Sequence, residues 1–579
     1  MSNATATLQP RHIWTFMLAR PYLCLAIVAL LLFLPGLFSL PPIDRDESRF
    51  AQATAQMLET GNYIEIKFLD EPRHKKPIGI HWLQALSVSA LSAVEDRQIW
   101  AYRLPSLLGA LIAVWLTFWG GRRLFGDETA LLGALWLAAS IIIAAESNLA
   151  TTDAVLLACV TAIQMTLGRI YLDHCDGGQA QLFRSPGVLA LLLWIALGFG
   201  LLIKGPMAPL VLGLTVVTLC LLDRQWLWLK RLSPLPGIVI ILVIVLPWSA
   251  AIWQATDGGF FVDALTNDMA AKIISGQEGH GAPPGTYLLA SPLLLWPASL
   301  VLGPAALLAW RRRHDPAVRF CLAWIIPSWL FFELLPTKLP HYVLPLLPPI
   351  MLLCAAGLKQ ISADLMAPEG AYDRAIMWGM ATLWLAVTGG LAIGIGVLPI
   401  FYGDGLSGLL VACAVIFFAA AVTAFLALAQ GNWLKITLAG MVVAALFNWS
   451  LLQGTLPLMT QFQISTAAAE AIARHHKNDT PVAVAGYSEP SLVFLLGTDT
   501  KLGTGQVAAD HIATTPGSLA LVESAQEDAF LSRLAQLNAT GQAIETVVGI
   551  NYSRGQNVTL TLYRATPQDA LNPESLLRQ

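Results

Sequence analysis

Long apolar runs dominate this chain. About thirteen of them occur between residues 22 and 457, at roughly 22–40, 104–120, 129–145, 149–171, 186–203, 206–222, 235–254, 286–310, 317–335, 341–358, 374–400, 405–429 and 433–457. A run of this length crosses a bilayer as a helix, because a helix satisfies its backbone hydrogen bonds internally. Only 12% of the 579 residues are charged, about half the share in soluble domains. The sequence therefore predicts an α-helical polytopic membrane protein with about thirteen transmembrane helices.

Lysine and arginine in short loops set the expected orientation of these helices. The basic loops read GGRRLFG, DRQWLWLKRL, RRRHDP and GNWLK. By the positive-inside rule they are cytoplasmic, and so is the N-terminus. An odd number of spans then places the charged loop at 41–103 and the C-terminal segment on the outer side. The sequence shows no cluster of basic residues on a soluble segment, which would have indicated nucleic-acid binding.

The composition changes near residue 460. Helical patterns in STAAAEAIARHH and EDAFLSRLAQL alternate with the strand-like runs PVAVAGY, SLVFLLG, SLALVES, AIETVVGI and NVTLTLYRA. This alternation predicts a small α/β domain at 459–579, on the outer side of a transmembrane domain at 1–458. No catalytic motif is visible in the smaller domain, so we expect it to serve in support, acceptor docking or assembly.

The first outer loop, 41–103, concentrates charge in an otherwise apolar chain. Asp46 begins the segment DESRFAQATAQMLETG, whose apolar residues have helical spacing and which Gly61 ends. Two interpretations of Asp46 remain open. It is either the N-cap of a helix lying on the membrane or a carboxylate that accepts a proton or orients an acceptor. Arg49, one turn further on, would face the same way.

A second helix is predicted to begin at Pro77, directly after Lys76. The helix dipole disfavours a lysine at this end. A lysine at this position becomes favourable if its ammonium and the free backbone N–H groups bind an anion together. A lipid phosphate at the bilayer surface is the obvious anion. The alternative is an ordinary interfacial lysine.

Charged residues also occur at the outer ends of later spans. Glu146 and Asp153 flank the start of one span, where an acidic group is costly unless it functions or caps the helix. The outer histidines His74, His81, His280 and His341 show no metal-ligand spacing. We therefore expect no metal or other cofactor, and a divalent metal held by these histidines with Asp or Glu is the alternative.

At these positions the chain resembles the prenyl-phosphate-dependent glycosyltransferases of the C superfold. The matching pieces are DESRFAQATAQML, KKPIGIHWL, YRLPSLLGA, TTDAVLL, KGP and KLPHYVLPLLPP, in the expected order. Within that group the chain is similar to the bacterial protein-mannosyltransferase-like branch that includes the lipid A 4-amino-4-deoxy-L-arabinose transferase. It departs from the aminoarabinose pattern at Lys75, where that pattern usually has Glu.

The resemblance implies roles for individual residues. Asp46 is the essential acid of the first loop and Asp153 that of the second, and we count Glu47 with them as catalytic. The candidates for binding the lipid phosphate are Arg49, Lys76, Lys204, Lys338 and Tyr342. The candidates for contacts to the acceptor are His280, His341 and Arg103.

The function that this resemblance implies is inverting transfer of a sugar from a polyprenyl-phosphate donor to an envelope acceptor at the periplasmic face of the inner membrane. A lipid A-like glycolipid is the expected acceptor. A protein O-mannosyltransferase-like enzyme and a flippase for prenyl-linked sugars are the alternatives. The sugar itself stays open between aminoarabinose, galacturonic acid, mannose and other hexoses.

Overall fold

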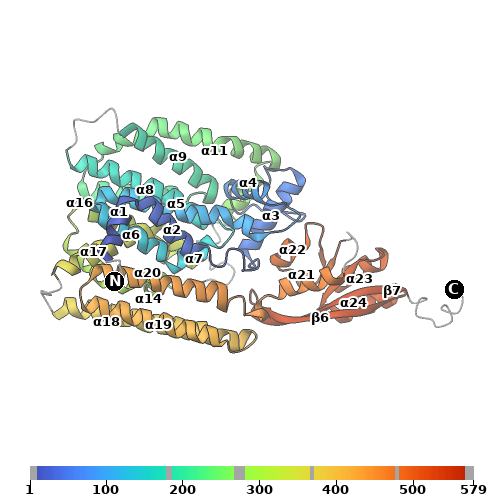
Figure 1. Cartoon of the computed structure of the whole chain (residues 1–579). Helices are drawn as coiled ribbons and strands as arrows, with labels where there is room; N and C mark the ends of the chain where they lie inside the picture. Colours follow the sequence, from blue (N-terminus) through green and yellow to red (C-terminus); the bar gives the residue numbers. More distant parts are fainter. Residues whose placement is uncertain (1–9, 178–185, 267–280, 365–370, 476–480, 568–579) are drawn as a thin grey trace, which may run out of the picture.

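The computed structural model describes residues 10–177, 186–266, 281–364, 371–475 and 481–567. Figure 1 shows a bundle of long helices, with a sheet and its helices projecting from one end. The helices α3 and α4 lie at that same end, between the bundle and the sheet. The first outer loop is therefore the junction of the two parts.

Each predicted apolar run coincides with a helix or a bent pair of helices. Nine described helices are long and apolar enough to span a membrane, or up to eleven if each of two bent pairs is one span. The nine are α5 (Ile99–Phe125), α8 (Asp153–Cys175), α9 (Pro186–Lys204), α11 (Pro234–Thr256), α16 (Pro316–Leu334), α17 (Leu347–Asp364) with the preceding turn η5 (Pro340–Leu346), α18 (Ala371–Tyr402), α19 (Gly408–Ala429) and α20 (Trp433–Trp449), which continues into η6 (Ser450–Thr455).

The two bent pairs and two shorter helices account for the other runs. One pair is α6 (Asp127–Ala139) with α7 (Ile141–Ser147), bent by 61°, and the other is α14 (Thr286–Leu294) with η4 (Ala298–Val301) and α15 (Leu302–Arg311), bent by 107°. The shorter apolar helices are α2 (Pro21–Phe33), which follows α1 (Pro10–Ala19), and α10 (Met207–Asp223). The polytopic fold is confirmed, and the count of thirteen spans stays a prediction.

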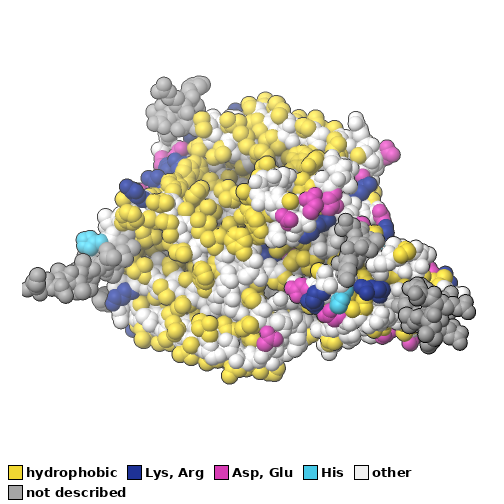
Figure 2. All heavy atoms as spheres, turned by 45° about the vertical axis from the view of Figure 1, so that its right-hand side comes forward, with side chains coloured by type: hydrophobic (Ala, Val, Ile, Leu, Met, Phe, Trp, Pro, Cys, Tyr) yellow, Lys and Arg dark blue, Asp and Glu magenta, His cyan; other side chains and the backbone are white. Residues whose placement is uncertain are grey.

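The surface of the bundle is suited to lipid. Figure 2 shows a broad hydrophobic surface across the helices, with charged side chains gathered toward the ends. The helices at the outside of the bundle keep large apolar side chains exposed; Leu242, Val243, Leu409 and Val415 are examples. Exposed apolar surface of this extent is unfavourable in water and favourable in hydrocarbon. The chain is thus a multi-pass membrane protein.

The sheet beyond the bundle has five strands in the order β4-β3-β5-β7-β6. Its strands are β3 (Ala483–Ala485), β4 (Lys501–Gly503), β5 (Leu519–Glu523), β6 (Ala539–Asn551) and β7 (Gln556–Pro567). The strands β4, β3 and β5 are parallel, and β7 is antiparallel to both β5 and β6. Two buried clusters, one with α21 (Ile464–His475) and α22 (Pro490–Leu496) and one with α23 (Gly505–Thr514) and α24 (Ser524–Gln536), cover its faces.

We call residues 464–567 the C-terminal sheet domain. The boundary predicted at residues 458 and 459 falls between η6 and the short turn η7 (Thr460–Phe462). One strand prediction was wrong, because SLVFLLG forms the helix α22. Its apolar residues are buried on two sides, Leu492 in the sheet domain and Phe494 against α3. A run that is apolar all round has no periodicity to separate a helix from a strand.

The first outer loop is packed tightly rather than lying loose on the membrane. It contains α3 (Asp46–Thr60), a short hairpin of β1 (Lys67–Phe68) and β2 (Glu71–Pro72), and α4 (Gly79–Leu91). The helix α3 ends at Gly61, whose φ of 69° is the left-handed cap expected from the sequence. One side of α3 packs on Tyr102 and Phe494, and the other on Trp248 and Phe260.

Candidate active site

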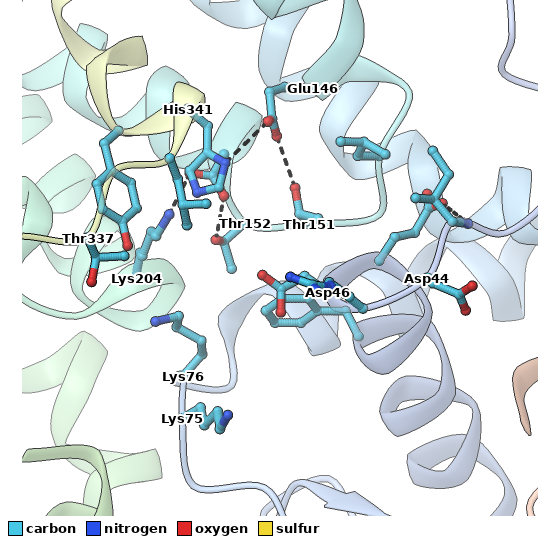
Figure 3. Close-up of a pocket in the computed structure, with 18 of the residues that line it drawn as sticks. Asp44, Asp46, Lys75, Lys76, Glu146, Thr151, Thr152, Lys204, Thr337 and His341 are labelled. Carbon is cyan, nitrogen blue, oxygen red and sulfur yellow. Dashed lines mark hydrogen bonds and ion pairs between the residues drawn. The ribbon is translucent and has the colours of Figure 1, made fainter. Parts of the chain in front are cut away.

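A polar cavity of about 310 Å³ lies where the first outer loop meets the ends of α7, α8, α9 and η5. Its charged and hydroxyl-bearing residues come from segments far apart in the sequence (Figure 3). They are Asp44, Arg45, Asp46, Glu47, Arg73, Lys75, Lys76, Glu146, Thr151, Thr152, Asp153, Lys204, Thr337, His341 and Tyr342. Gathering so many charges in one hollow, several of them buried, is costly unless they bind a ligand or one another.

Asp46 lies across the cavity from Lys76 and Lys204 in Figure 3. It is the first residue of α3, and Arg45 precedes the helix, so the prediction that Asp46 is the N-cap was wrong. Its side chain is 61% exposed, and its carboxylate lies 3.8 Å from the guanidinium of Arg73. The carboxylate is therefore open to a molecule that enters the cavity.

A buried ion pair holds Lys204 in place. The Nζ of Lys204 is 2.5 Å from Oδ1 of Asp153, and both side chains are less than 10% exposed. The same ammonium lies 5.7 Å from the ring centre of Tyr342. The Gly205–Pro206 break after α9 ends that helix at Lys204, so the side chain reaches the cavity wall. The carboxylate of Asp153 and the aromatic face of Tyr342 fix the direction of this side chain.

Lys75 and Lys76 enter the cavity from the loop before α4. The helix begins at Gly79 and not at Pro77, as was predicted, so Lys76 lies three residues ahead of the helix instead of directly before it. The start of α4 packs closely on the end of α9, since a Cβ on Gly79 would lie 2.7 Å from the carbonyl oxygen of Leu202. The two lysines are thereby brought beside the end of α9 and Lys204.

The three lysines also line a second, apolar cavity of about 440 Å³. Its walls are the ends of α9, α10, α11 and α16 with the segment after α11, and their apolar side chains include Leu202, Met207, Leu210, Val245, Trp248, Phe260, Phe261, Leu265, Phe331 and Leu335. Tyr342 is shared with the polar cavity as well. The pair of cavities thus joins a charged hollow to an apolar one through Lys75, Lys76 and Lys204.

Three metal-ligating side chains meet at the inner wall of the polar cavity. Glu146, Asp153 and His341 offer ligand atoms within 4.8 Å of one another. His341 lies 3.6 Å from Glu146 and 3.9 Å from Asp153, and Thr151 donates to Glu146 over 3.2 Å. The donor set suits a divalent ion, but the ammonium of Lys204 already contacts Asp153. One cation thus already neutralises Asp153, one of the two carboxylates of this wall.

Two other outer histidines that the structure describes, His74 and His81, have partners outside this cluster. His74 bonds Asp263 over 2.8 Å, and His81 bonds the hydroxyl of Thr54 over 2.8 Å. Burial lowers the pKa of His81 to about 3, so it is neutral at physiological pH. His280 lies outside the described residues. Among the described outer histidines, His341 is the one that lies in a group of three metal-ligating side chains.

Glu47 is enclosed in hydrogen bonds rather than facing a substrate. Its Oε1 accepts from Arg103 and from the backbone N–H of Ala150, and its Oε2 accepts from Arg103 and from the backbone N–H of Ile43, all within 2.9 Å. All lone pairs of the carboxylate are thus engaged. This geometry favours a structural role for Glu47 over the catalytic role predicted from the sequence.

Arg103 does not line the cavity, contrary to the prediction that it contacts the acceptor. It is completely buried, and besides Glu47 it donates to the carbonyls of Leu37, Leu40 and Pro41. Five hydrogen bonds use all five of its N–H groups. The prediction failed because position at a span end does not give the direction of a side chain.

Two predicted phosphate ligands also lie outside both cavities. Lys338 donates to the backbone carbonyls of Glu333 and Leu335, and so caps the end of α16. Burial lowers its pKa. Arg49 is not among the described lining residues, and its charge acts on Asp44 instead. Arg45 and Arg73 line the cavity in their place. The sequence feature that could have identified Arg45 and Arg73 is their position in the charged loop at 41–103.

Comparison with known proteins finds relatives in sequence. Residues 75–253 match the family described as dolichyl-phosphate-mannose-protein mannosyltransferase. The undecaprenyl phosphate-α-4-amino-4-deoxy-L-arabinose arabinosyl transferase of Pseudomonas paraeruginosa is 29% identical over 62% of this chain and 64% of its own length. The enzyme of that name from an Enterobacter species is 28% identical over 55% of this chain and 56% of its own length. The matched part thus spans less than two thirds of either relative.

Solved structures extend the likeness to the whole fold. The crystal structure of ArnT from Cupriavidus metallidurans bound to undecaprenyl phosphate has a TM-score of 0.70, with 17% identity, over 95% of this chain and 98% of that one. The oligosaccharyltransferase of Archaeoglobus fulgidus in its apo form has a TM-score of 0.51, with 11% identity, over 88% of this chain and 69% of that one. The chain therefore has the fold of a C-superfold glycosyltransferase, and its sequence resembles that of the lipid A arabinose transferases.

Proposed function

We propose that this protein transfers a sugar from a polyprenyl-phosphate donor to an envelope glycolipid, with a lipid A-like molecule as the acceptor. The observation that supports this proposal is the joining of the two cavities through Lys75, Lys76 and Lys204. A ligand that fills both must have an anionic head, an apolar tail and a polar group beyond the head. A prenyl chain linked through a phosphate to a sugar has this chemistry.

In the proposed reaction the lipid phosphate is the leaving group. Negative charge grows on its oxygens as the bond to the sugar C1 breaks. The ammonium groups at the boundary of the two cavities stabilise that charge, an effect of about 3 kcal/mol for one well-placed donor. Asp153 acts by orienting Lys204, whose Nζ it contacts at 2.5 Å, and Glu146 and His341 offer hydrogen bonds to the sugar.

Asp46 acts on the acceptor. Its open carboxylate lies on the other side of the cavity from Lys76 and Lys204. An acceptor oxygen held there approaches C1 from the face opposite the phosphate, and this gives inversion. The carboxylate orients a hydroxyl acceptor and takes its proton. If the acceptor is already a phosphate, Asp46 only orients it.

The proposed orientation puts this reaction on the periplasmic side of the inner membrane, with the N-terminus in the cytoplasm. The helix α5 begins beside the first outer loop and ends at Arg122 and Arg123, and α16 begins after Arg311, Arg312 and Arg313 and ends beside the cavity. The arginine-rich ends thus lie opposite the cavity, as the positive-inside rule requires.

The experiment that tests the proposal uses the purified protein in detergent with an undecaprenyl-phosphate-linked sugar and lipid A. We expect the wild-type protein to form glycosylated lipid A, and D46N to bind undecaprenyl phosphate as the wild type does without forming product. Comparing sugars in the donor then names the substrate. Product on a peptide acceptor alone would favour the protein O-mannosyltransferase alternative, and normal turnover by D46N would refute the role of Asp46.

A further inference from the structure

We propose that the C-terminal sheet domain positions Asp46 for the reaction, and that Tyr552 is the positioning residue through which it acts. This inference rests on the proposed function and assigns a task to the domain that the sequence left open. It is carried by the two residues that precede Asp46, because both are bound by residues about 450 to 510 positions later in the chain.

The contacts to these two residues are direct. The backbone N–H of Asp44 donates to Oη of Tyr552 over 2.6 Å, and Oδ1 of Asp44 accepts from the backbone N–H of Ser491 over 3.1 Å. The guanidinium of Arg45 donates to the carbonyl of Ser553. The side chain of Asp44 accordingly points away from Lys76 in Figure 3. The sheet domain thus binds both the backbone and the side chains of the segment before Asp46.

The backbone at Arg45 shows that this segment is held under constraint. Its φ of 68° and ψ of −114° lie where residues other than glycine are rarely found. Such a conformation persists when the surrounding contacts determine it. Arg45 has contacts on both sides, since it lines the polar cavity and also binds Ser553. Release of the segment would let Arg45 relax and would turn the start of α3.

The other side of Asp46 is fixed to the helical bundle. Glu47 is locked by Arg103, and it also accepts from the backbone N–H of Ile43 over 2.8 Å. Asp46 therefore lies between an anchor in the bundle and an anchor in the sheet domain. Its own carboxylate is 3.8 Å from Arg73, beyond hydrogen-bond distance. Its neighbours, more than its own contacts, hold Asp46 in position.

The sheet domain is docked firmly enough to serve as an anchor. Phe494 of α22 is completely buried, with its ring centre 5.2 Å from that of Tyr102. Thr498 accepts from Gln52 over 2.7 Å and donates to Glu59 over 2.6 Å, and both partners belong to α3. The contact therefore runs along α3 and does not depend on the Tyr552 hydroxyl alone. Removal of that hydroxyl should leave the domain docked.

The test compares Y552F with Y563F in the purified full-length protein. Tyr563 lies in β7 of the same domain, and its hydroxyl donates to Glu527, away from the first outer loop. We expect kcat for sugar transfer to fall about five- to tenfold in Y552F, the effect of one hydrogen bond. The KM for the donor and the affinity for undecaprenyl phosphate should stay unchanged, because the three lysines are untouched. Y563F should keep the wild-type kcat.

Equal kcat values for Y552F and Y563F would overturn the inference. So would a Y552F protein that loses donor affinity and kcat together, because that pattern shows disruption and not positioning. If Y552F does not fold, D44N and D44L test the other contact of the sheet domain to this loop, the one from the Ser491 N–H to the Asp44 carboxylate. D44N keeps an acceptor for the Ser491 N–H, and we expect its kcat to exceed that of D44L at least fivefold; equal values would again overturn the inference. Absence of transfer by the wild-type protein would overturn the proposed function and this inference together, whereas an active wild type with an equally active Y552F overturns this inference alone.

Discussion

The buried pair of Glu47 and Arg103 gives the sharpest test of how this site is built. In E47A the guanidinium of Arg103, which is completely buried, loses its counter-ion and keeps only backbone carbonyls. The backbone N–H groups of Ile43 and Ala150 lose their acceptor as well. Breaking a buried ion pair by removing one partner costs about 3–5 kcal/mol. That is a large part of the total stability of a typical domain, about 5–15 kcal/mol.

We expect E47A and R103A each to lower the thermal unfolding midpoint strongly, and E47A/R103A to lower it by much less than the sum. The double variant leaves no unpaired buried charge, so the largest part of the penalty is absent. Tryptophan fluorescence in detergent measures the midpoint, and sugar transfer is followed in the same samples. D127A is the matched control, because the Asp127–Arg122 pair is about half exposed and should contribute under about 1 kcal/mol.

Two results would refute this reasoning. Additive losses in E47A/R103A would show that the two side chains are not coupled. An E47A protein with the wild-type midpoint and no transfer would show that Glu47 takes part in the chemistry, as the sequence had suggested. In that case the four hydrogen bonds to its carboxylate would have to open during turnover.

Three further predictions follow from the cavity and the loop. K204M should lower kcat at least a hundredfold, because it removes one donor to the leaving phosphate and leaves Asp153 buried without its 2.5 Å partner. Measurements of undecaprenyl phosphate binding and of transfer rates check this prediction. Burial raises the pKa of Asp44 from 3.8 to about 6, so ionisation of Asp44 destabilises the folded protein as pH rises from about 4 to 6, by up to about 3 kcal/mol. D44N should therefore melt above the wild type at pH 8 and with it at pH 4, and equal midpoints at pH 8 would contradict the assignment. Treatment with EDTA should leave transfer within about twofold, since Lys204 already neutralises Asp153; a loss that Mg²⁺ restores would instead assign a metal to Glu146, Asp153 and His341.

The fold was largely predictable from the sequence because its strongest signal is local. A run long enough to span a bilayer has one way to satisfy its backbone, so each predicted run coincides with described helical structure. Gly61 ended α3 as expected, since its conformation depends on neighbours in the chain. The strand prediction for SLVFLLG failed because Phe494 and Leu492 are buried by different parts of the protein. No local sequence pattern records that.

The sequence was enough to predict which segments form the site, but not which side chains of those segments enter it. Asp46, Lys76, Asp153 and Lys204 meet in one cavity, because the ends of their helices share one side of the membrane. Orientation about each helix depends on tertiary contacts that the sequence does not show. Lys338, for example, turned to cap α16, although it lies at the same level as the others.

The sharing of three lysines between the two cavities also has a kinetic consequence for the proposed enzyme. After transfer, the polyprenyl phosphate keeps its prenyl chain in the apolar cavity and its phosphate on Lys75, Lys76 and Lys204, as the donor did. Only the contacts to the sugar are lost. In such an enzyme the spent carrier lipid would compete with the donor for the same site, and its departure into the bilayer would precede each new turnover. The rate in a cell then follows how fast the membrane pool of free carrier lipid is recycled.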